Sequence, residues 1–297
     1  MDKLDAMRTF LAVADHGSFI EAARLLRLSS AGVTRAVAQL EGDLGVALLR
    51  RTTRSVALTE RGAIYADRCR RLLSDVDEAA TLVRGEDAAP RGLLSVTAPV
   101  MFGQLHVLPV VEVLAARHSN LTIRLTLVDR VTHLVEEGFD LAVRIAPPVD
   151  SALVGVPLAR VRRVTVASPA YLAAHGTPEV PGDLRLHSII AFEGIGTTNE
   201  WHFGRDGQTS VALTPRLSVN TAAAAIAAAE RGLGITRVLS YQVQAALAEG
   251  RLARILTEHE PDPVPATLLY QASQRSSANI RAFVSAARER FAGLALD

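Results

Sequence analysis

The start of the chain carries apolar side chains at the three- and four-residue spacing of α-helices, in three short stretches. The apolar positions are Leu4, Met7, Phe10, Leu11 and Ala14, then Ala22, Ala23, Leu25 and Leu26, then Val33, Val37 and Leu40. Ser18 and Ser29 are good N-caps for the second and third stretches, and Glu21 would complete a capping box. Gly45 is suited to end the third. We therefore expect two helices joined by a tight connection, with a preceding helix that covers the same core.

The outer face of the third helix is small and hydrogen-bonding. Ser30, Ala31, Thr34, Arg35 and Ala38 lie there. A helix can read base edges only if it lies deep in the major groove, and a bulky outer face would hold it off. Arg35 can reach a guanine edge or a phosphate, and Thr34 can serve a base or the backbone. An ordinary helical hairpin with a solvated face has the same spacing, so the helices alone leave that alternative open.

An arginine cluster follows the third helix. Arg50, Arg51 and Arg54 lie close together and are interleaved with Thr52 and Thr53 and followed by Ser55, and Val56–Leu58 is a candidate strand. This pattern is typical of a wing, a hairpin that places arginines along the phosphates or in the minor groove. Between Arg24 and Arg54 there are six basic residues and two acidic ones, although the net charge of the 297-residue chain is only +1. We expect this patch to contact phosphates and its binding to weaken as salt rises.

A long helix is predicted from Thr59 and Glu60 to about Gly85, followed by a hinge to Gly92. Its apolar seam consists of Tyr65, Cys69, Leu72, Val76, Ala79 and Val83. The alternating spacing of four and three favours a dimerising helix, and packing on the protein's own second domain is the alternative. Cys69, the single cysteine, would then be a packed residue and not a redox sensor.

After the hinge, strand and helix patterns alternate. Expected strands are 93–98, 121–128, 139–146, 161–168, 187–192, 216–219, one beginning at 232–235, and 266–273. Expected helices are 103–117, 131–137, 169–175, 221–231, 240–248 and 277–291. Such alternation predicts a mostly parallel sheet covered by helices.

Several function classes find no support in the sequence. Lys3 is the only lysine, which argues against a Walker-type or Schiff-base lysine, and the common hydrolase, zinc-protease and dinucleotide motifs do not occur. His133 with Glu136 and Glu137 is the nearest approach to a metal cluster, and a solvated face explains it better. A lone cysteine, no export leader and no apolar run of bilayer length favour a cytoplasmic protein. We expect no enzymatic activity, no catalytic residue, no metal and no cofactor.

A series of residues, which occur in the same order along the chain, resembles the LysR-type transcriptional regulators over almost the whole chain. In the first part these residues are Phe10, Ser18-Phe19, Ala22–Leu25, Ser29, Val33–Arg35, Gln39–Glu41, Leu44-Gly45, Leu48-Leu49, Arg51-Thr52 and Leu58–Gly62. In the second part they are Asp140–Arg144, Val166–Ala173, Trp201–Phe203, Arg216–Asn220 and Gly232–Ile235. The segment Ser30–Gly32 departs from the family pattern, which usually has Gln-Pro or Pro-Ala there.

The resemblance implies an α/β protein with an N-terminal winged helix-turn-helix, a long linker helix and a two-lobed periplasmic-binding-protein-like (type II) effector domain. We expect the DNA-binding domain at 1–58, the linker and hinge at 59–88, and the effector domain at 89–297. Its lobe 1 would span about 92–160 and 266–297, and its lobe 2 about 161–265. The partners implied are a double-stranded DNA operator, a small-molecule effector, and further copies of the chain, as a homodimer through residues 59–85 and a homotetramer. The DNA-binding residues would be Ser18, Ser29, Ser30, Ala31, Thr34, Arg35, Arg50, Arg51, Thr52 and Arg54.

Ligands of parallel sheets bind beyond the carboxyl ends of the strands, and helix N-termini favour anions. We therefore expect a small, partly apolar, anionic effector between the lobes. The candidate effector-binding residues are Ala98, Pro99, Val100, Met101, Val128, Arg144, Asn220 and Thr221. Simple helix capping is the alternative for Asn220 and Thr221, and a structural ion pair is the alternative for Arg144.

Two rival functions share part of the pattern. A solute-binding protein would have the second domain but would leave the helix-turn-helix unexplained. An architectural DNA-binding protein would have the first domain but would not need a large α/β domain with a cleft.

Overall fold

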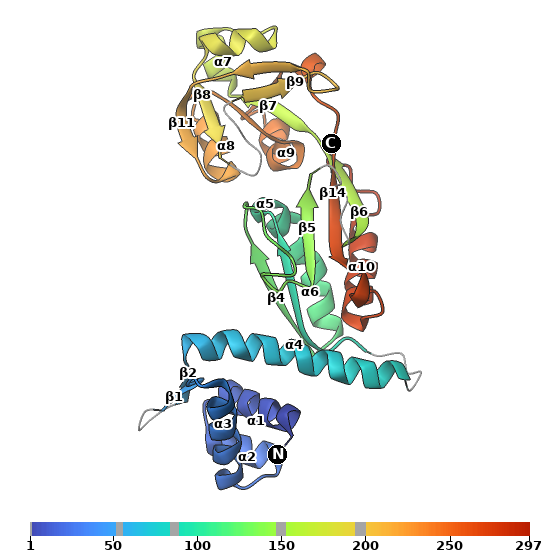
Figure 1. Cartoon of the computed structure of the whole chain (residues 1–297). Coiled ribbons are helices and arrows are strands. Elements are labelled where there is room, and N and C mark those ends of the chain that lie inside the picture. The colour runs from blue at the N-terminus through green and yellow to red at the C-terminus, as the bar shows by residue number, and fades with distance from the viewer. Residues whose placement is uncertain (1, 52–55, 84–88, 147–152, 194–199) are drawn as a thin grey trace. The chain divides into compact units, whose positions relative to one another are not determined.

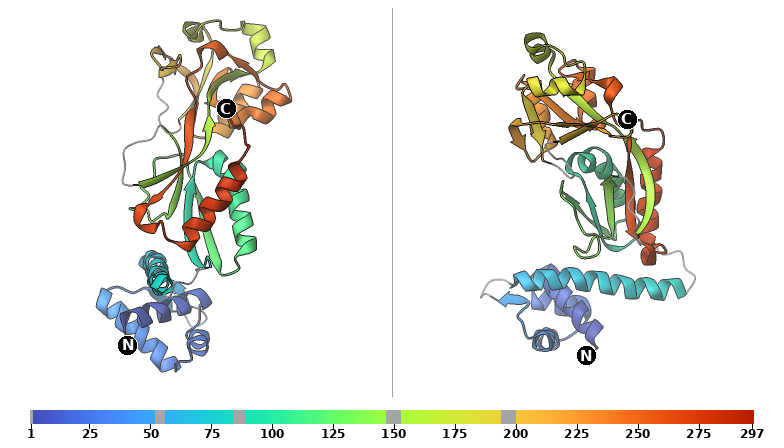
Figure 2. Two further views of the ribbon diagram at one scale, coloured as in Figure 1. Left: turned by 90° about the vertical axis from the view of Figure 1, so that its right-hand side faces the viewer. Right: turned by 45° about the horizontal axis from the view of Figure 1, so that its top comes forward.

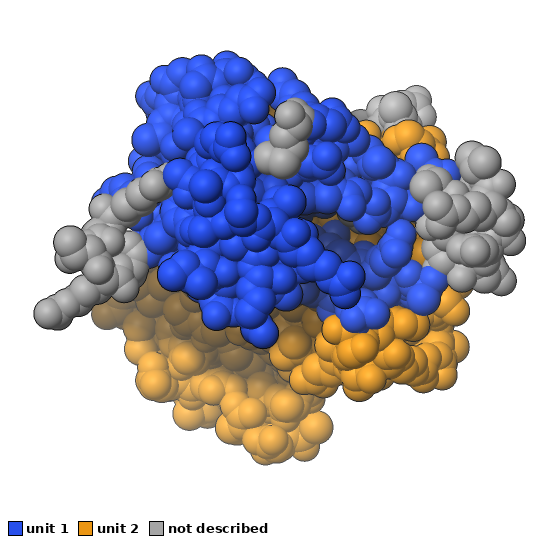
Figure 3. Space-filling view, turned by 90° about the horizontal axis from the view of Figure 1, so that it is seen from below, with its two compact units in different colours: residues 1–93, 120–122 blue, residues 94–119, 123–297 orange. Residues whose placement is uncertain are grey.

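A computed structural model describes residues 2–51, 56–83, 89–146, 153–193 and 200–297 (Figure 1). The chain divides into two compact units, which Figure 3 shows in separate colours. The first comprises residues 1–93 and 120–122, and the second comprises residues 94–119 and 123–297.

The first unit contains a winged helix-turn-helix and a long helix. Its elements are α1 (Lys3–His16), α2 (Phe19–Leu26), α3 (Ser30–Leu44), β1 (Leu49–Arg51), β2 (Val56–Leu58) and α4 (Glu60–Val83). β1 and β2 pair antiparallel, with Arg50 opposite Ala57. Phe10, Val33 and Leu40 lie at the centre of the core. The predicted helices and the wing strand β2 are confirmed.

Both predicted serine caps are present. Ser18 Oγ accepts a hydrogen bond from the Glu21 N–H at 3.3 Å, and Ser29 Oγ accepts one from the Gly32 N–H at 3.1 Å. The capping box at Ser18 is only half formed, because the Glu21 carboxylate accepts a hydrogen bond from Arg24 Nε at 3.2 Å. The caps fix where α2 and α3 begin, and so fix the turn between them.

The start of α4 packs closely on the wing. Thr59 Oγ1 accepts from the Gly62 N–H at 2.9 Å and donates to the Ala47 carbonyl at 2.9 Å. A Cβ at position 62 would lie 1.9 Å from the Leu48 carbonyl oxygen. Only glycine permits this approach without a shift of the backbone.

The seam predicted along α4 divides between two environments. Cys69 is buried in the core of the first unit, and Tyr65 packs against it, with its ring 5.8 Å from that of Phe10. Burial raises the pKa of the Cys69 thiol, as expected for a packed residue. Leu72 and Val76 are exposed (49% and 38%). The first part of the seam, Tyr65 and Cys69, therefore docks α4 on its own unit, which neither sequence interpretation anticipated.

The remainder of the chain forms two lobes, each built on a five-stranded sheet (Figures 1 and 2). Lobe 1 has strand order β4-β3-β5-β14-β6. Its elements are β3 (Gly92–Ala98), α5 (Val100–Phe102), a π-helical turn (Gly103–Val107), α6 (Leu108–Arg117), β4 (Leu121–Leu127), β5 (Leu141–Ile145), β6 (Leu153–Val161), β14 (Val264–Gln271) and α10 (Ala278–Phe291). α6 and α10 lie side by side (Figure 2).

Lobe 2 has strand order β11-β8-β12-β7-β13. Its elements are β7 (Arg163–Ala167), α7 (Pro169–His175), β8 (Ile189–Phe192), β9 (Glu200–Phe203), β10 (Thr209–Ala212), β11 (Pro215–Val219), α8 (Ala222–Glu230), β12 (Ile235–Leu239), α9 (Ser240–Ala248) and β13 (Ala253–Ile255). β9 and β10 form a separate antiparallel hairpin. The sequence did not predict β6, this hairpin or β13.

Both sheets are mixed, so the prediction of a mostly parallel sheet is wrong. β3 is parallel to β5, and β8 is parallel to β11 and β12. β14 is antiparallel to β5 and β6, and β7 is antiparallel to β12 and β13. β6, β7 and β14 are the strands by which the chain crosses between the lobes, so they do not follow the strand–helix–strand rule that keeps neighbours parallel.

The predicted helix at 131–137 is also wrong, because these residues form irregular turns. The Glu137 carboxylate accepts from the His133 N–H at 3.0 Å and is held by Arg130 at 2.9 and 2.6 Å. Arg130 lowers the pKa of Glu137 to about 2. The side-chain bond to backbone closes a turn that competes with helix formation.

The helical run Val100–Arg117 is, among the described residues, long and apolar enough to cross a membrane by length and composition. The expectation that no run approaches bilayer length is therefore wrong on this measure. Phe102, Val110 and Leu114 are buried, and α6 packs on α10. The run is thus apolar because it supplies the core of lobe 1.

Among the described residues, three segments join the lobes. They are the crossing at Arg162 between β6 and β7, residues 256–263 between β13 and β14, and residues 292–297 after α10. The Ser240 hydroxyl at the start of α9 accepts from the Arg162 N–H at 3.0 Å and donates to the Leu296 carbonyl. Leu296 is 2% exposed, so the last segment is packed against lobe 2.

Candidate nucleic-acid interface and interlobe cavity

The solvent-facing side of α3 carries the predicted base-reading residues. Ser30, Ala31 and Arg35 are exposed, and Thr34 is half-buried. Arg35 Nε–H donates to the Ala31 carbonyl at 3.4 Å, a weak bond that leaves both terminal nitrogens for an external acceptor. Ser29 is used as the cap of α3, so its contribution to this face is to fix where the helix begins.

The wing provides a second exposed cationic position. Arg50 is exposed in the middle of β1, and the β1 backbone extends through Arg51. Thr52 and Arg54 lie outside the described residues. Ser18, on the far side of the turn, is half-buried and accepts the hydrogen bond that caps α2.

A carboxylate of α3 holds the start of the wing. One oxygen of Glu41 accepts from the backbone N–H groups of Leu48 at 2.7 Å and Leu49 at 3.0 Å. The two residues are 1% and 7% exposed, so these N–H groups have little access to water. The bonds fix the position of β1 relative to α3, and this role of Glu41 was not predicted from the sequence.

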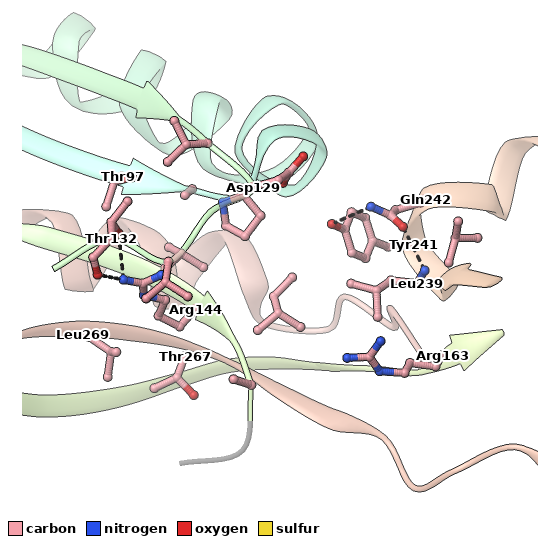
Figure 4. A pocket seen from close by; sticks show the side chains of 18 of the residues that line it. Thr97, Asp129, Thr132, Arg144, Arg163, Leu239, Tyr241, Gln242, Thr267 and Leu269 are labelled. Atoms are coloured by element: carbon pink, nitrogen blue, oxygen red, sulfur yellow. Dashed lines mark hydrogen bonds between the residues drawn. The ribbon is translucent and has the colours of Figure 1, made fainter. Parts of the chain in front are cut away.

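A cavity of about 630 Å³ lies between the lobes (Figure 4). Of the predicted effector residues, Ala98, Pro99, Val128 and Arg144 line it. Most of the wall is apolar, and the charged or hydrogen-bonding lining residues are Thr97, Asp129, Thr132, Arg144, Arg163, Arg237, Tyr241, Gln242 and Thr267. Size and composition fit a small organic ligand.

The other four predicted residues are not among the lining residues. Val100 and Met101 begin α5, and Met101 packs against the core of lobe 2. Thr221 Oγ1 accepts from the Ala224 N–H at 3.3 Å and caps α8, and Asn220 before it is exposed. Their role in binding stays a prediction.

The helix start at Val100 is already occupied. The Val100 N–H donates to Asp129 Oδ1 at 2.9 Å. The positive end of this helix therefore faces a carboxylate of the protein, and the expected anion site at its N–H groups is partly filled from within.

Arg144 is committed to lobe 1. Its guanidinium donates to the carbonyl and the hydroxyl of Thr132, the latter at 2.7 Å (Figure 4). Burial lowers the pKa of Arg144. The residue thus joins β5 to the loop after β4, through a neutral partner and not the ion pair that was the sequence alternative.

Two cavity arginines of lobe 2 were missed by the sequence analysis. Arg163 and Arg237 lie on β7 and β12, which pair antiparallel with Arg163 opposite Leu239 and Arg237 opposite Thr165. Residues so placed share one face of the sheet. A correct prediction would have required the register of two strands that are far apart in the sequence.

An aromatic cluster that includes the lining residue Tyr241 spans both lobes. Phe102 and His106 contribute from the helical run of lobe 1, Phe291 from α10, and Tyr241 from α9 of lobe 2. His106 is 8% exposed, and neither ring nitrogen has a hydrogen-bond partner among the described residues. Burial lowers its pKa, with a smaller contribution from Arg290.

Comparison with known families matches both parts of the chain. The description "Bacterial regulatory helix-turn-helix protein, lysR family" matches residues 4–63, and "LysR substrate binding domain" matches residues 87–292. The transcriptional regulator PtxR of Pseudomonas aeruginosa is 34% identical over 289 residues, which cover 96% of this chain and 92% of PtxR. A transcriptional repressor of the same species is 32% identical over 295 residues, covering 98% and 93%.

Solved structures resemble the chain over its full length. CrgA of Neisseria meningitidis, a LysR-type transcriptional regulator, matches with a TM-score of 0.61 at 29% identity and covers 96% of this chain and 98% of its own. The Vibrio cholerae virulence activator AphB matches with a TM-score of 0.61 at 23% identity, covering 98% and 100%, which is a likeness of fold.

Proposed function

Since the chain belongs to the LysR family of DNA-binding transcriptional regulators, we propose that it binds its operator through α3 and the wing and responds to a small anionic effector in the interlobe cavity. The regulator has a DNA-binding domain and an effector-binding domain, and the family consists of regulators and not enzymes. The proposal concerns the residues that carry each activity and the chemistry of the effector.

The DNA-contacting surface we assign is the exposed start of α3 together with Arg50. The side chains of Ser30 and Ala31 are short, so the helix can approach the floor of the major groove closely. Arg35 would then reach a base edge or phosphate, and Arg50 would contact the backbone from the wing. Thr52 and Arg54 keep the same assignment from the sequence.

We assign dimerisation to α4. Its side chains Ile64, Leu72 and Val76 are exposed (63%, 49% and 38%) and recur at helical spacing. Exposed apolar side chains in a stripe favour association with a second copy, because burial of such surface is the main driving force of helix pairing. A dimer would present two α3 helices to a partly two-fold-symmetric operator, and pairs of dimers would form the tetramer.

The proposal that the effector is an anion rests on the charge of the cavity wall. Among its described lining residues there are three arginines and one carboxylate, that of Asp129. The Asp129 carboxylate already accepts from the Val100 N–H. A wall of this kind favours an anion with an apolar body, since the rest of the lining is mainly aliphatic.

The test is a salt-dependent binding measurement on the DNA upstream of the chain's own gene. We expect Arg35→Ala to lose preference for this DNA over a scrambled duplex, by about tenfold to a hundredfold, and to retain weak non-specific binding. Arg216→Ala, at an exposed position of lobe 2, is the matched control. Full preference in Arg35→Ala would refute the assignment of α3.

A panel of organic acids added to the same assay tests the effector. We expect at least one acid to shift the operator affinity, whereas an architectural protein would show no shift and a solute-binding protein would show no operator preference.

A further inference from the structure

Two cationic side chains share one face of the lobe 2 sheet. The β7–β12 register places Arg163, Leu239 and Arg237 on the same face, and all three line the cavity. Arg163 and Arg237 are diagonal neighbours across the two strands, a position at which long side chains come within reach of one another. Like charges so placed repel, and a protein maintains them only where something offsets the cost.

The surroundings of Arg237 offset part of that cost. Its guanidinium lies 4.7 Å from the centre of the Phe203 ring and donates to the His202 carbonyl at 2.5 Å. Burial and the charge of Arg163 lower the pKa of Arg237 to about 10. Arg237 is therefore held by the β9–β10 hairpin of its own lobe.

Arg163 has no such partner. Within the part of the chain that the structure describes, its guanidinium has no hydrogen bond and no ion pair, and Figure 4 shows it beside the cavity. Burial lowers the pKa of Arg163, and no neighbouring carboxylate opposes this effect. A half-buried guanidinium whose five donors have no acceptor among the described residues is costly to maintain and is available to a ligand.

We propose that Arg163 binds the anionic group of the effector, and that this group is the carboxylate of an acid with an apolar body. The inference rests on the proposed function, and it replaces Arg144 by Arg163 as the anion-binding residue of the cavity. The guanidinium fork matches the two oxygens of one carboxylate. Leu239 lies directly opposite Arg163, and Phe192 and Leu269 line the same cavity, so the remainder of the ligand meets apolar wall.

The residues also favour a carboxylate over a phosphate. A phosphate group carries more charge and an additional oxygen, and it requires several committed donors. Here Arg163 is the one lining arginine, among those described, whose donors are all unused, because Arg144 is bonded to Thr132 and Arg237 to His202. The one guanidinium group with free donors therefore matches the single charge and the two oxygens of a carboxylate.

The single tryptophan of the chain provides the readout. Trp201 lies 6.0 Å from the Arg237 guanidinium, which lines the cavity. Titrations of the full chain would follow its fluorescence, confirmed by calorimetry, with benzoate, phenylacetate and hexanoate as probes. Benzamide and phenylacetamide are the uncharged counterparts, and inorganic phosphate is the alternative anion. We expect at least one of the acids to bind and its amide to bind at least tenfold more weakly.

Arg163→Met is expected to weaken binding of that acid by about tenfold to a hundredfold. Arg163→Lys should recover part of the affinity, since it restores the charge but not the fork. Arg216→Met, which makes the same substitution at an exposed position of lobe 2, should bind as the wild type does. Because Arg163 lacks a partner, Arg163→Met should unfold at the wild-type temperature or above it.

Three results would overturn the inference and leave the anionic effector standing. They are equal binding of the acid by Arg163→Met and the wild type, binding of phosphate but of no carboxylate, and a fall of several degrees in the unfolding temperature of Arg163→Met, which would indicate a structural role. Binding of an amide as tightly as its acid, or of none of the anions, would overturn the anionic effector as well.

Discussion

Glu41 provides the sharpest test of how the wing is held. One of its carboxylate oxygens accepts from the N–H groups of Leu48 and Leu49, at 2.7 and 3.0 Å. Glu41→Ala leaves both donors without an acceptor. An unsatisfied buried donor costs about 1 to 3 kcal/mol, and water can enter beside the half-buried position 41, so we expect a loss of about 2 to 3 kcal/mol for the pair.

The assay is amide hydrogen exchange of the full chain, followed in peptides that cover residues 46–51. A local loss of about 2 to 3 kcal/mol raises exchange by about 30- to 150-fold. Glu41→Gln keeps one acceptor oxygen and should lie much nearer the wild type. Asp43→Ala, at an exposed position on the same helix, is the control for loss of charge. Exchange in Glu41→Ala within twofold of Asp43→Ala would show that the carboxylate does not hold the wing.

Two further predictions concern stability. Gly62→Ala should destabilise the first unit by about 2 to 3 kcal/mol, because the new Cβ would lie 1.9 Å from the Leu48 carbonyl oxygen, whereas Gly42→Ala meets nothing within 4 Å and should stabilise α3 by about 0.5 to 1 kcal/mol. Urea unfolding of both variants checks the opposite signs. The lowered pKa of His106 means that below about pH 6.5 the unfolded chain binds a proton that the folded chain does not, so stability is lost as the pH falls further. His106→Leu should flatten this part of the thermal stability profile between pH 7.5 and 5, and parallel curves for the two proteins would contradict it.

The first unit was predictable because its information is local. Ser18 and Ser29 cap helices within three residues of themselves, and Gly45 ends α3 in the left-handed conformation, at φ +68°. Helix spacing and caps can be read over a few residues of sequence. The exception is Glu41, whose two acceptor bonds reach residues that are seven and eight positions away.

The cavity was predictable only on one side. Ala98, Pro99, Val128 and Arg144 are at or near the ends of lobe 1 strands, where the rule for ligand sites places them, and they line the cavity. Arg163 stands at the start of β7 in a run with Arg162, and from sequence such a pair is typical of a solvated surface. Its inward position depends on pairing with β12, which lies far along the chain.

Irregular segments account for the wrong elements. The stretch 131–137 has helical spacing but is closed into turns by Glu137. The strand predicted at 161–168 is in fact two strands, β6 and β7, which the chain breaks at Arg162 as it passes from one lobe to the other. The pattern of apolar and polar residues reports local composition, and it does not show where the chain passes from one sheet to another.

The bonds at Ser240 set a limit on how this protein can acquire a new ligand. Val238, Leu239, Tyr241 and Gln242 line the lobe 2 side of the cavity together with residues of other strands. Ser240, which lies among them in the chain, is bonded both to the Arg162 crossing and to the Leu296 carbonyl. A substitution in this stretch therefore alters the joint between the lobes together with ligand choice. Thr97 in lobe 1 also lines the cavity but lies outside these bonds. Directed evolution of ligand specificity is therefore better begun at Thr97, where a substitution need not alter how the two lobes respond to the ligand.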